Sequence, residues 1–261
     1  MKTYRFAYGS GTVEFPLEEK NIIGELHGNV VEPISDIRKE LWASLDAPID
    51  SAPLCRRVTP GSTVALVVSD MSRFWMRQDL VVPHLVDYLT QRCGVSERDI
   101  TIVIANGTHT GGDEAELRTL VTDAVYDRIT VENHNCESED LVYLGTTPHG
   151  TPVSINRTAA LADMVICLGA ATHHVMAGFG GGRKSILPGI SGRETIFHNH
   201  AFSLDAAALR SNPAVGNGIL QGNPLHEDMC EAAGLVKNLF MVNLVMNTQM
   251  RLAAIFSGHY L

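Results

Sequence analysis

The chain has 261 residues, of which 45% are hydrophobic and 19% are charged. That length suffices for one large α/β domain or two small ones with a sizeable buried core. The 29 Asp and Glu residues outnumber the 20 Lys and Arg residues, which gives a formal net charge of -9. Nucleic acids and anionic membranes bind clustered positive charge, so this acidic balance argues against both as partners.

The five cysteines have no short spacing and no CxxC motif, and they are Cys55, Cys93, Cys136, Cys167 and Cys230. An odd number without a pairing pattern fits a reducing compartment better than a disulfide framework. The N-terminus lacks an apolar run of signal-peptide length, and no segment approaches 18 uninterrupted apolar residues. We therefore expect a soluble, cytoplasmic protein without a membrane partner.

The first third of the chain predicts a hairpin followed by alternating helices and strands. Tyr4 to Pro16 reads as a small hairpin around a Gly-Ser-Gly turn. Helical periodicity runs from Ile34 to Leu45, and the apolar run from Ser62 to Asp70 suits a buried parallel strand. A helix-like stretch then extends from Asp79 to Gly94, which is a plausible residue to end it.

The same alternation continues to the end of the chain. Asp99 to Gly107 reads as a strand that leads into an acidic-started helix. Further predicted strands cover residues 128–133, 140–147, 163–170, 238–247 and 251–258. Strands alternating with helices at this spacing predict an α/β fold with a doubly wound, Rossmann-like, mostly parallel sheet and flanking helices.

Unusual polar residues follow three of these predicted strands. Asp70 to Arg73 follows one, Asn106 to His109 follows the next, and Thr172 to His174 follows a third. In open α/β sheets, ligands bind in the crevice beyond the carboxyl ends of the strands. The three clusters are therefore expected to converge on one site.

A glycine-rich segment, residues 173–200, carries the densest signal. Its glycines free the backbone to approach a ligand and to aim successive N–H groups at an anion. Lys184-Ser185 follows them, but a P-loop requires glycine directly before the lysine, and Arg183 stands there. The bland alternative is a flexible surface loop with a solvated lysine. The histidine pairs His173-His174 and His198/His200 in the same stretch favour a site.

Histidine is the commonest side-chain ligand of nickel, copper, zinc and iron. The sequence has no HExxH motif and no Cys/His spacing of a structural zinc site. A metal held partly by an organic cofactor and partly by one histidine therefore fits better than a cage of protein ligands.

The stretch from His174 through the glycines, Lys184-Ser185 and Pro188-Gly189 to His200 resembles the signature of the nickel-pincer lactate racemases and related 2-hydroxyacid racemases. Ser69-Asp70-x-Ser72-Arg73 and Asn106-Gly107-Thr108-His109 are similar to two further motifs of that family, in the same order. The resemblance runs from about residue 10 to the end. It implies that residues 1–261 form the N-terminal cofactor-binding catalytic domain of a two-domain family.

The resemblance also implies a cofactor and a reaction. The family uses a nickel-pincer nucleotide, pyridinium-3,5-bisthiocarboxylic acid mononucleotide carrying nickel, and racemises 2-hydroxyacids by hydride transfer. Carried onto this sequence, Lys184 would be the covalent tether and His200 the nickel ligand. His109 and His174 would be the paired proton-transfer groups, because imidazole titrates near working pH and each enantiomer presents its hydroxyl to a different side.

The remaining implied contacts come from the turn after the first buried strand. Asp70, Met71, Ser72 and Arg73 would bind the cofactor, and Arg73 would also orient the substrate. Three alternatives stay open: Lys184 as a phosphate-binding ammonium, His198 in place of His200 as the ligand, and His173 in place of His174 as the base.

Two departures from the family pattern affect the function. Phe74 stands where proline is frequent, and the family's C-terminal domain, which closes over the cofactor, is absent from this chain. The implied partners are a small 2-hydroxyacid, the cofactor maturation enzymes, and a C-terminal domain or partner chain that completes the site. The alternatives are a split or non-catalytic cofactor-carrying domain and an unrelated histidine-metal hydrolase or lyase.

Overall fold

A computed structural model describes residues 1–260, and its contacts divide the chain into two compact units. The first unit is Met1–Val31, and the second begins at Glu32. Within the described residues, no helix is both long enough and apolar enough to cross a membrane.

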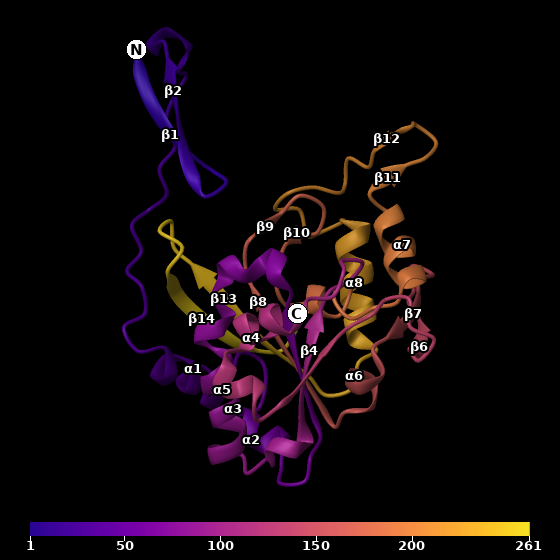
Figure 1. Cartoon of the computed structure of the whole chain (residues 1–261). Coiled ribbons are helices and arrows are strands. Elements are labelled where there is room, and N and C mark those ends of the chain that lie inside the picture. The colour runs from indigo at the N-terminus through magenta and orange to yellow at the C-terminus, as the bar shows by residue number, and fades with distance from the viewer. Residues whose placement is uncertain (261) are drawn as a thin grey trace. The chain divides into compact units, whose positions relative to one another are not determined.

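The first unit is the predicted hairpin. Strands β1 (Lys2–Tyr8) and β2 (Gly11–Leu17) pair antiparallel, with Phe6 opposite Val13 (Figure 1). Gly9 has a φ of 57°, a backbone conformation that glycine adopts without steric cost and that the tight turn requires. A single 3-10 turn, Glu19–Asn21, follows the hairpin.

The second unit is built on one six-stranded sheet with the order β14-β13-β8-β3-β4-β5. Five strands run parallel, and only β14 is antiparallel to its neighbour. The prediction of a mostly parallel α/β sheet is therefore confirmed. The strands are β3 (Val64–Ser69), β4 (Ile100–Ala105), β5 (Thr130–Asn133), β8 (Met164–Ala170), β13 (Leu239–Met246) and β14 (Leu252–Gly258).

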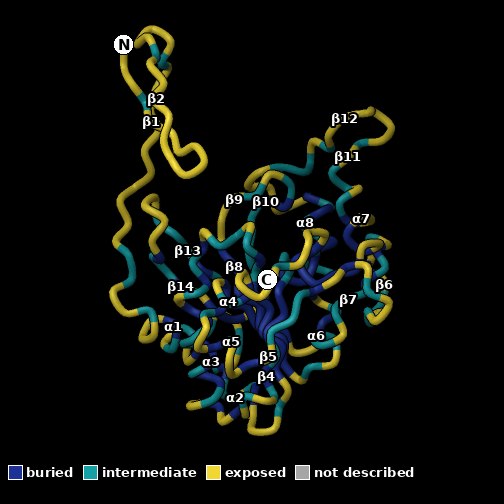
Figure 2. Tube along the Cα trace, viewed as in Figure 1, coloured by how far each residue is buried: buried dark blue, intermediate teal, exposed yellow. Residues whose placement is uncertain are grey.

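The central strands are apolar throughout because both of their faces are covered. In β3, Leu66 and Val68 belong to one core, whereas Ala65 and Val67 belong to the other. Successive side chains of a strand point to opposite faces, so a single apolar run supplies both cores. Figure 2 shows these strands as the buried centre of the unit.

Helices cover the two faces separately (Figure 1). The first core is covered by α1 (Ile37–Asp46), α2 (Leu54–Arg57), α3 (Val82–Asp87), α4 (Glu114–Val121) and α5 (Asp123–Tyr126). The second core is covered by α6 (Arg157–Leu161), α7 (Arg193–Ala201) and α8 (Pro224–Gly234). The expected doubly wound arrangement is thus present.

Short elements complete the unit. The two-stranded pairs are β6 (Val142–Thr146) with β7 (Pro152–Ile155), β9 (His173–His174) with β10 (Gly178–Phe179), and β11 (Leu204–Asp205) with β12 (Arg210–Ser211). The 3-10 turns are Met71–Met76, Gln78–Leu80, Glu97–Asp99 and Gly182–Ser185.

The predicted helix from Asp79 to Gly94 is not continuous. A 3-10 turn ends at Leu80, α3 has proline in its first turn, and a π-helical turn, Tyr88–Arg92, completes the segment. The predicted end is correct, because Gly94 has a φ of 72°. Periodicity located the segment, but it does not distinguish the three helical hydrogen-bond patterns.

The strand order creates a crevice at one edge of the sheet. From β3 the chain proceeds outward through β4 to β5, then returns to the other side of β3 as β8 and continues to β13. The order therefore reverses between β3 and β8. Such a reversal separates the two connecting segments beyond the carboxyl ends of these strands and leaves room for a ligand.

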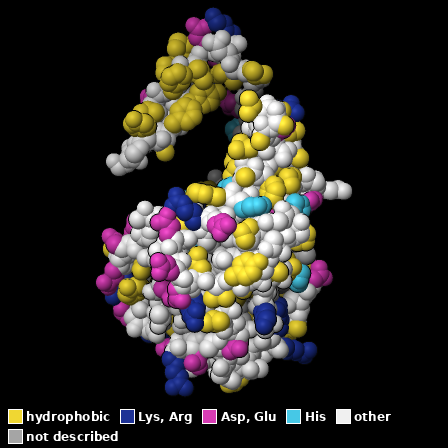
Figure 3. All heavy atoms as spheres, turned by 90° about the vertical axis from the view of Figure 1, so that its right-hand side faces the viewer, with side chains coloured by type: hydrophobic (Ala, Val, Ile, Leu, Met, Phe, Trp, Pro, Cys, Tyr) yellow, Lys and Arg dark blue, Asp and Glu magenta, His cyan; other side chains and the backbone are white. Residues whose placement is uncertain are grey.

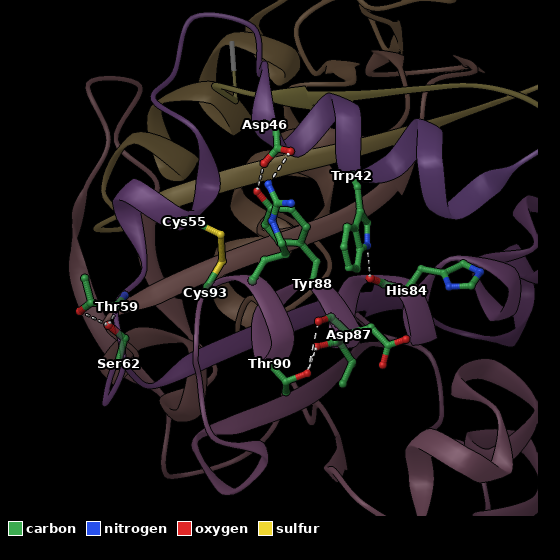
Figure 4. Close-up of a disulfide and its surroundings, with 12 residues drawn as sticks. Trp42, Asp46, Cys55, Thr59, Ser62, His84, Asp87, Tyr88, Thr90 and Cys93 are labelled. Carbon is green, nitrogen blue, oxygen red and sulfur yellow. Dashed lines mark hydrogen bonds and ion pairs between the residues drawn. A yellow bond between two sulfur atoms is a disulfide. The ribbon is translucent and has the colours of Figure 1, made fainter.

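Cys55 and Cys93 form a disulfide, so the expectation that the cysteines stay unpaired is wrong for this pair (Figure 4). Their Cα atoms lie 4.8 Å apart across a sequence separation of 38 residues. Only the packing of α2 beside the end of the π-helical turn brings them together, and no spacing rule reveals that. Cys136, Cys167 and Cys230 are free.

The neighbourhood of the disulfide is fixed by polar contacts to α1. Tyr88 donates its hydroxyl hydrogen to Asp46 Oδ1 at 2.6 Å, and Trp42 Nε1 donates to the backbone oxygen of His84 at 3.0 Å (Figure 4). Burial and the Asp46 carboxylate both raise the pKa of Tyr88, which therefore stays protonated.

Reduction of the disulfide should lower stability without unfolding the chain. A crosslink over a loop of this length removes entropy from the unfolded state and stabilises by about 2–4 kcal/mol. We expect urea unfolding to show this loss when reductant is added. A Cys55→Ala/Cys93→Ala variant, as the control, should be insensitive to reductant, and five free thiols in the unreduced, denatured wild type would contradict the crosslink.

Candidate functional site

A cleft of about 380 Å³ lies beyond the carboxyl ends of β3, β4 and β8, where the strand order reverses. The three polar clusters predicted to converge do so, because each contributes lining residues. Further lining residues come from α7, from the loop between Gly180 and Gly189, and from the strand ends themselves. Gly107 N–H donates to Gly189 O at 2.9 Å, which ties the turn after β4 to the lysine-bearing loop.

One wall of the cleft holds a carboxylate–histidine pair. Asp70 Oδ2 lies 2.6 Å from His109 Nδ1, and Asp70 is 8% exposed. Ser72 donates its hydroxyl hydrogen to Asp70 Oδ1 at 2.6 Å, so both carboxylate oxygens have partners. The carboxylate fixes the imidazole orientation and favours hydrogen on Nδ1 in the neutral ring, which leaves Nε2 free to accept a proton.

A buried glutamine holds this wall in place. Gln78 Nε2 donates to Ser69 O at 2.8 Å, and Gln78 Oε1 accepts from Ser69 N–H at 3.1 Å. Gln78 has no exposed surface. The Gln78 amide thus binds both backbone groups of Ser69, as a neighbouring strand would. This fixes the end of β3 and so positions Asp70, the next residue.

The other residues of the turn after β3 line two different cavities. Arg73 lines the main cleft, and its guanidinium donates to Ser72 Oγ at 2.7 Å. Met71 packs partly against the first core and, with Ser72, lines a smaller cavity behind the Asp70–His109 pair instead of the main cleft. Cofactor contact by Met71 and Ser72 stays a prediction.

The opposite wall holds His174 and Lys184. His174 Nδ1 accepts the backbone N–H groups of Met176 and Ala177 at 3.2 and 3.1 Å, so hydrogen in the neutral ring is assigned to Nε2. That Nε2 atom lies 3.2 Å from Lys184 Nζ. Burial, followed by the positive charges of Lys184 and Arg73, lowers the pKa of His174 to about 4.

Lys184 is an amine of unusually low basicity. Burial lowers its pKa to about 7, and the charges of Arg73 and Arg183 add to that effect. An ordinary lysine has a pKa of about 10.4 and is almost fully protonated at neutral pH. The lowered pKa lets far more of the Lys184 amine carry a free nucleophilic lone pair near neutral pH than an exposed lysine would.

His200 reaches the cleft from α7. Its pKa is lowered, chiefly by burial and then by the charge of Lys184, so the ring is neutral at pH 7. Its Nδ1 atom is buried and makes no hydrogen bond of good geometry within residues 1–260, although the Ile196 backbone partly opposes the lowering of its pKa. Neutral imidazole is the form that binds transition metals.

The neighbouring histidines that were rivals for these positions lie elsewhere. His198 Nδ1 donates to Thr151 Oγ1 at 2.9 Å, because the Thr151 hydroxyl hydrogen is donated to Asp228. His173 is exposed and packs on Phe179 with ring centroids 4.8 Å apart. Neither lines the main cleft. The placement favours His174 and His200, whose roles stay predictions.

The glycine-rich loop serves a different purpose from the one expected. Gly180 N–H donates to Thr172 O at 2.7 Å, and Gly182 N–H donates to Asn243 Oδ1 at 2.8 Å, so neither is free for an anion. A Cβ on Gly181, whose φ is 75°, would lie 2.4 Å from Asn243 Oδ1. For Gly180 and Gly182 the anion-cradle interpretation is therefore wrong, and Gly181 lets the loop pack closely against Asn243 of β13.

Arg183, whose position before Lys184 excludes a P-loop, anchors the loop from Gly180 to Gly189 that bears Lys184. Its guanidinium donates to Ala177 O at 2.7 Å, to Phe179 O at 3.2 Å and to His226 Nδ1 at 2.7 Å. It is 7% exposed, and no carboxylate pairs with it in the described part of the chain. The sequence feature that could have indicated this anchoring role is an arginine inside a glycine-rich, apolar stretch.

One group of metal-ligand type occurs within the described residues, and it lies outside the cleft: His149, Asp228 and Glu231. Asp228 already accepts hydrogen bonds from Thr147 and Thr151, and His149 Nδ1 pairs with Glu231 at 2.8 Å. The cleft histidines form no such group. A histidine-metal hydrolase therefore gains no support from the cleft.

Comparison with known proteins gives this geometry a family context. Residues 8–211 match the family described as the lactate racemase N-terminal domain. The chain belongs to this family. It is 29% identical to lactate racemase of Thermoanaerobacterium thermosaccharolyticum over 99% of its length, and 28% identical to lactate racemase of Lactiplantibacillus plantarum over 96%.

Solved structures agree with the sequence relatives. The lactate racemase apoprotein from T. thermosaccharolyticum matches 99% of the chain with a TM-score of 0.84 and 27% identity. A Thermotoga maritima protein matches 85% of the chain with a TM-score of 0.64 at 22% identity, which shows the fold alone. The chain spans only 60% and 58% of the two curated relatives.

The reactivity of Lys184 should have its own pH profile. Competitive acetylation followed by peptide mass spectrometry should show Lys184 reactivity reaching a plateau above about pH 7, whereas exposed lysines keep gaining reactivity towards pH 10. Arg73→Gln removes a nearby positive charge and should move the midpoint upward. Arg5→Gln, in the hairpin, should not. A Lys184 profile parallel to that of the exposed lysines would contradict the lowered pKa.

Proposed function

We propose that this chain is the cofactor-binding and proton-transferring part of a 2-hydroxyacid racemase of the lactate racemase type. The observation that carries the proposal is the low-basicity Lys184 amine, which faces a cleft shared with His109, His174 and His200. Racemase relatives and the family match support the reaction class. The 2-hydroxyacid substrate and the nickel-pincer nucleotide are part of the proposal.

The residues present fit such a cofactor. Lys184 supplies a free amine for an amide-type bond, and His200 supplies a neutral imidazole with a buried Nδ1 atom that makes no hydrogen bond of good geometry within residues 1–260. Arg73 and Arg183 bring positive charge beside Lys184, which suits an anionic cofactor. When bound, the nickel-pincer nucleotide supplies the hydride acceptor that the side chains lack.

Proton transfer is the task of the two cleft histidines. Interconversion of 2-hydroxyacid enantiomers through a planar 2-oxoacid requires the hydroxyl proton to leave on one side and return on the other. Asp70 holds His109 so that its Nε2 atom is available, and His174 is anchored by two backbone N–H groups. His109 can accept the hydroxyl proton at Nε2, whereas the neutral His174 ring can donate a hydrogen bond from Nε2 to a substrate oxygen.

Arg73 is the candidate for holding the substrate carboxylate. It lines the cleft, and its guanidinium is positioned by Ser72, which is bound to Asp70. A planar guanidinium matches a carboxylate through paired N–H groups. The same turn would thus orient both the substrate and His109.

A second candidate function is a cofactor-carrying domain that acts only with a separate partner. The matched region is 60% of a curated relative's length, so the remaining C-terminal part of a racemase can be supplied as a separate chain to test this function. Restored racemisation on addition of a separate C-terminal fragment would distinguish a split enzyme from a carrier.

Loading of Lys184 can be tested without the rest of the enzyme. Protein produced together with the cofactor maturation enzymes should carry a covalent adduct on Lys184 and one nickel per chain, by intact mass and metal analysis. Lys184→Arg keeps the positive charge but should lose the adduct. Stoichiometric zinc with an unmodified Lys184 would reject the cofactor.

The Asp70–His109 pair should affect turnover but not loading. In the chain joined to a C-terminal racemase region, His109→Gln should lower kcat for a 2-hydroxyacid about 10²–10⁴-fold, the usual contribution of a proton-transfer group. Asp70→Asn should also lower kcat, since an amide can donate to Nδ1 and select the wrong tautomer. Unchanged turnover in His109→Gln, with the Lys184 adduct intact, would remove His109 from the mechanism.

A further inference from the structure

The hairpin of the first unit has one apolar face and one polar face. In the antiparallel register, Tyr4 lies opposite Phe15, and Phe6 lies opposite Val13, so these four side chains share a face with Tyr8. The other face carries the Arg5–Glu14 ion pair at 2.7 Å. Figure 3 shows hydrophobic side chains gathered along the hairpin.

This apolar face is exposed. Phe6 is 54% exposed, Phe15 55%, Tyr8 75% and Val13 44%. A two-stranded sheet alone is marginally stable in water, and strict alternation of apolar and polar residues is the pattern of a sheet with one buried face. Three neighbouring aromatic rings with this exposure indicate an interaction surface.

The part of a racemase beyond the matched region is the candidate for covering the apolar face of the hairpin. The apoprotein of the T. thermosaccharolyticum racemase matches 99% of this chain, so the match includes the hairpin, yet this chain covers only 59% of that protein. About two fifths of the relative therefore lies outside the matched region and is available to cover the apolar face of the hairpin. A segment of the same polypeptide also has an effective concentration that a second copy at micromolar concentration cannot reach.

We propose that the face formed by Tyr4, Phe6, Tyr8, Val13 and Phe15 is a docking surface for the C-terminal domain that lactate racemases carry beyond the region matched here. The inference rests on the proposed function in one respect, that this chain is the N-terminal part of such an enzyme. The hairpin would then have a role separate from the cleft, because it would hold the C-terminal domain that completes the enzyme.

The test compares this chain with the same chain extended by the C-terminal region of the T. thermosaccharolyticum enzyme. Hydrogen exchange of the peptide covering residues 2–17 should be near the unprotected rate in the shorter chain and at least about 10-fold slower in the extended one. Phe6→Ser/Phe15→Ser should abolish this protection. Arg5→Ser/Glu14→Ser, the matched control on the polar face of the same strands, should retain it.

Each other outcome overturns the proposal. Absence of protection in the extended chain shows that the domain does not cover the hairpin. Protection in the shorter chain that rises with concentration, together with a dimer in light scattering, assigns the face to a second copy. Protection in the shorter chain that does not depend on concentration assigns the face to the second unit of this chain. Failure of Lys184 to acquire an adduct, with hairpin protection intact, would reject the racemase function and leave the docking surface standing.

Discussion

The two-sided burial of β3 and β8 is the constraint on which the rest of the second unit depends. Because both faces of these strands must be covered, the connections after β3 and after β8 run on opposite sides of the sheet. Their divergence opens the crevice that holds His109 on one side and Lys184 on the other. Core packing and site position thus have the same cause.

The loop that bears Lys184 is held by packing and by Arg183. Glycine at position 181 allows the loop to approach Asn243, and the Arg183 guanidinium binds the carbonyl groups of Ala177 and Phe179. Placing an arginine here without a carboxylate is costly. One consequence is electrostatic, because that charge helps to keep the Lys184 amine unprotonated.

The sheet, most strand positions and the convergence of three polar turns could be predicted from apolar runs and from the residues that follow them. Those signals are local, because a buried strand and its terminal turn are contiguous in sequence. The Cys55–Cys93 disulfide, the Arg183–His226 contact and the Gly182–Asn243 bond could not, since each joins segments 38 to 61 residues apart. The packing of the glycine-rich loop could not be predicted either. Glycine indicates that the backbone approaches another group closely, but not which group it approaches.

The two cleft histidines are held by opposite electrostatics. His109 pairs with a buried carboxylate. His174 instead faces Lys184, Arg73, His200 and Arg183, whose charges lower its pKa further, in addition to the larger effect of burial. Acylation of Lys184 would replace an amine that can be protonated with an uncharged amide nitrogen. That change would remove the largest charge effect on His174 and raise its pKa, while burial, the larger cause, would continue to lower it. Lys184 and His174 therefore influence each other electrostatically across 3.2 Å, and the proposed covalent attachment would change the basicity of this imidazole.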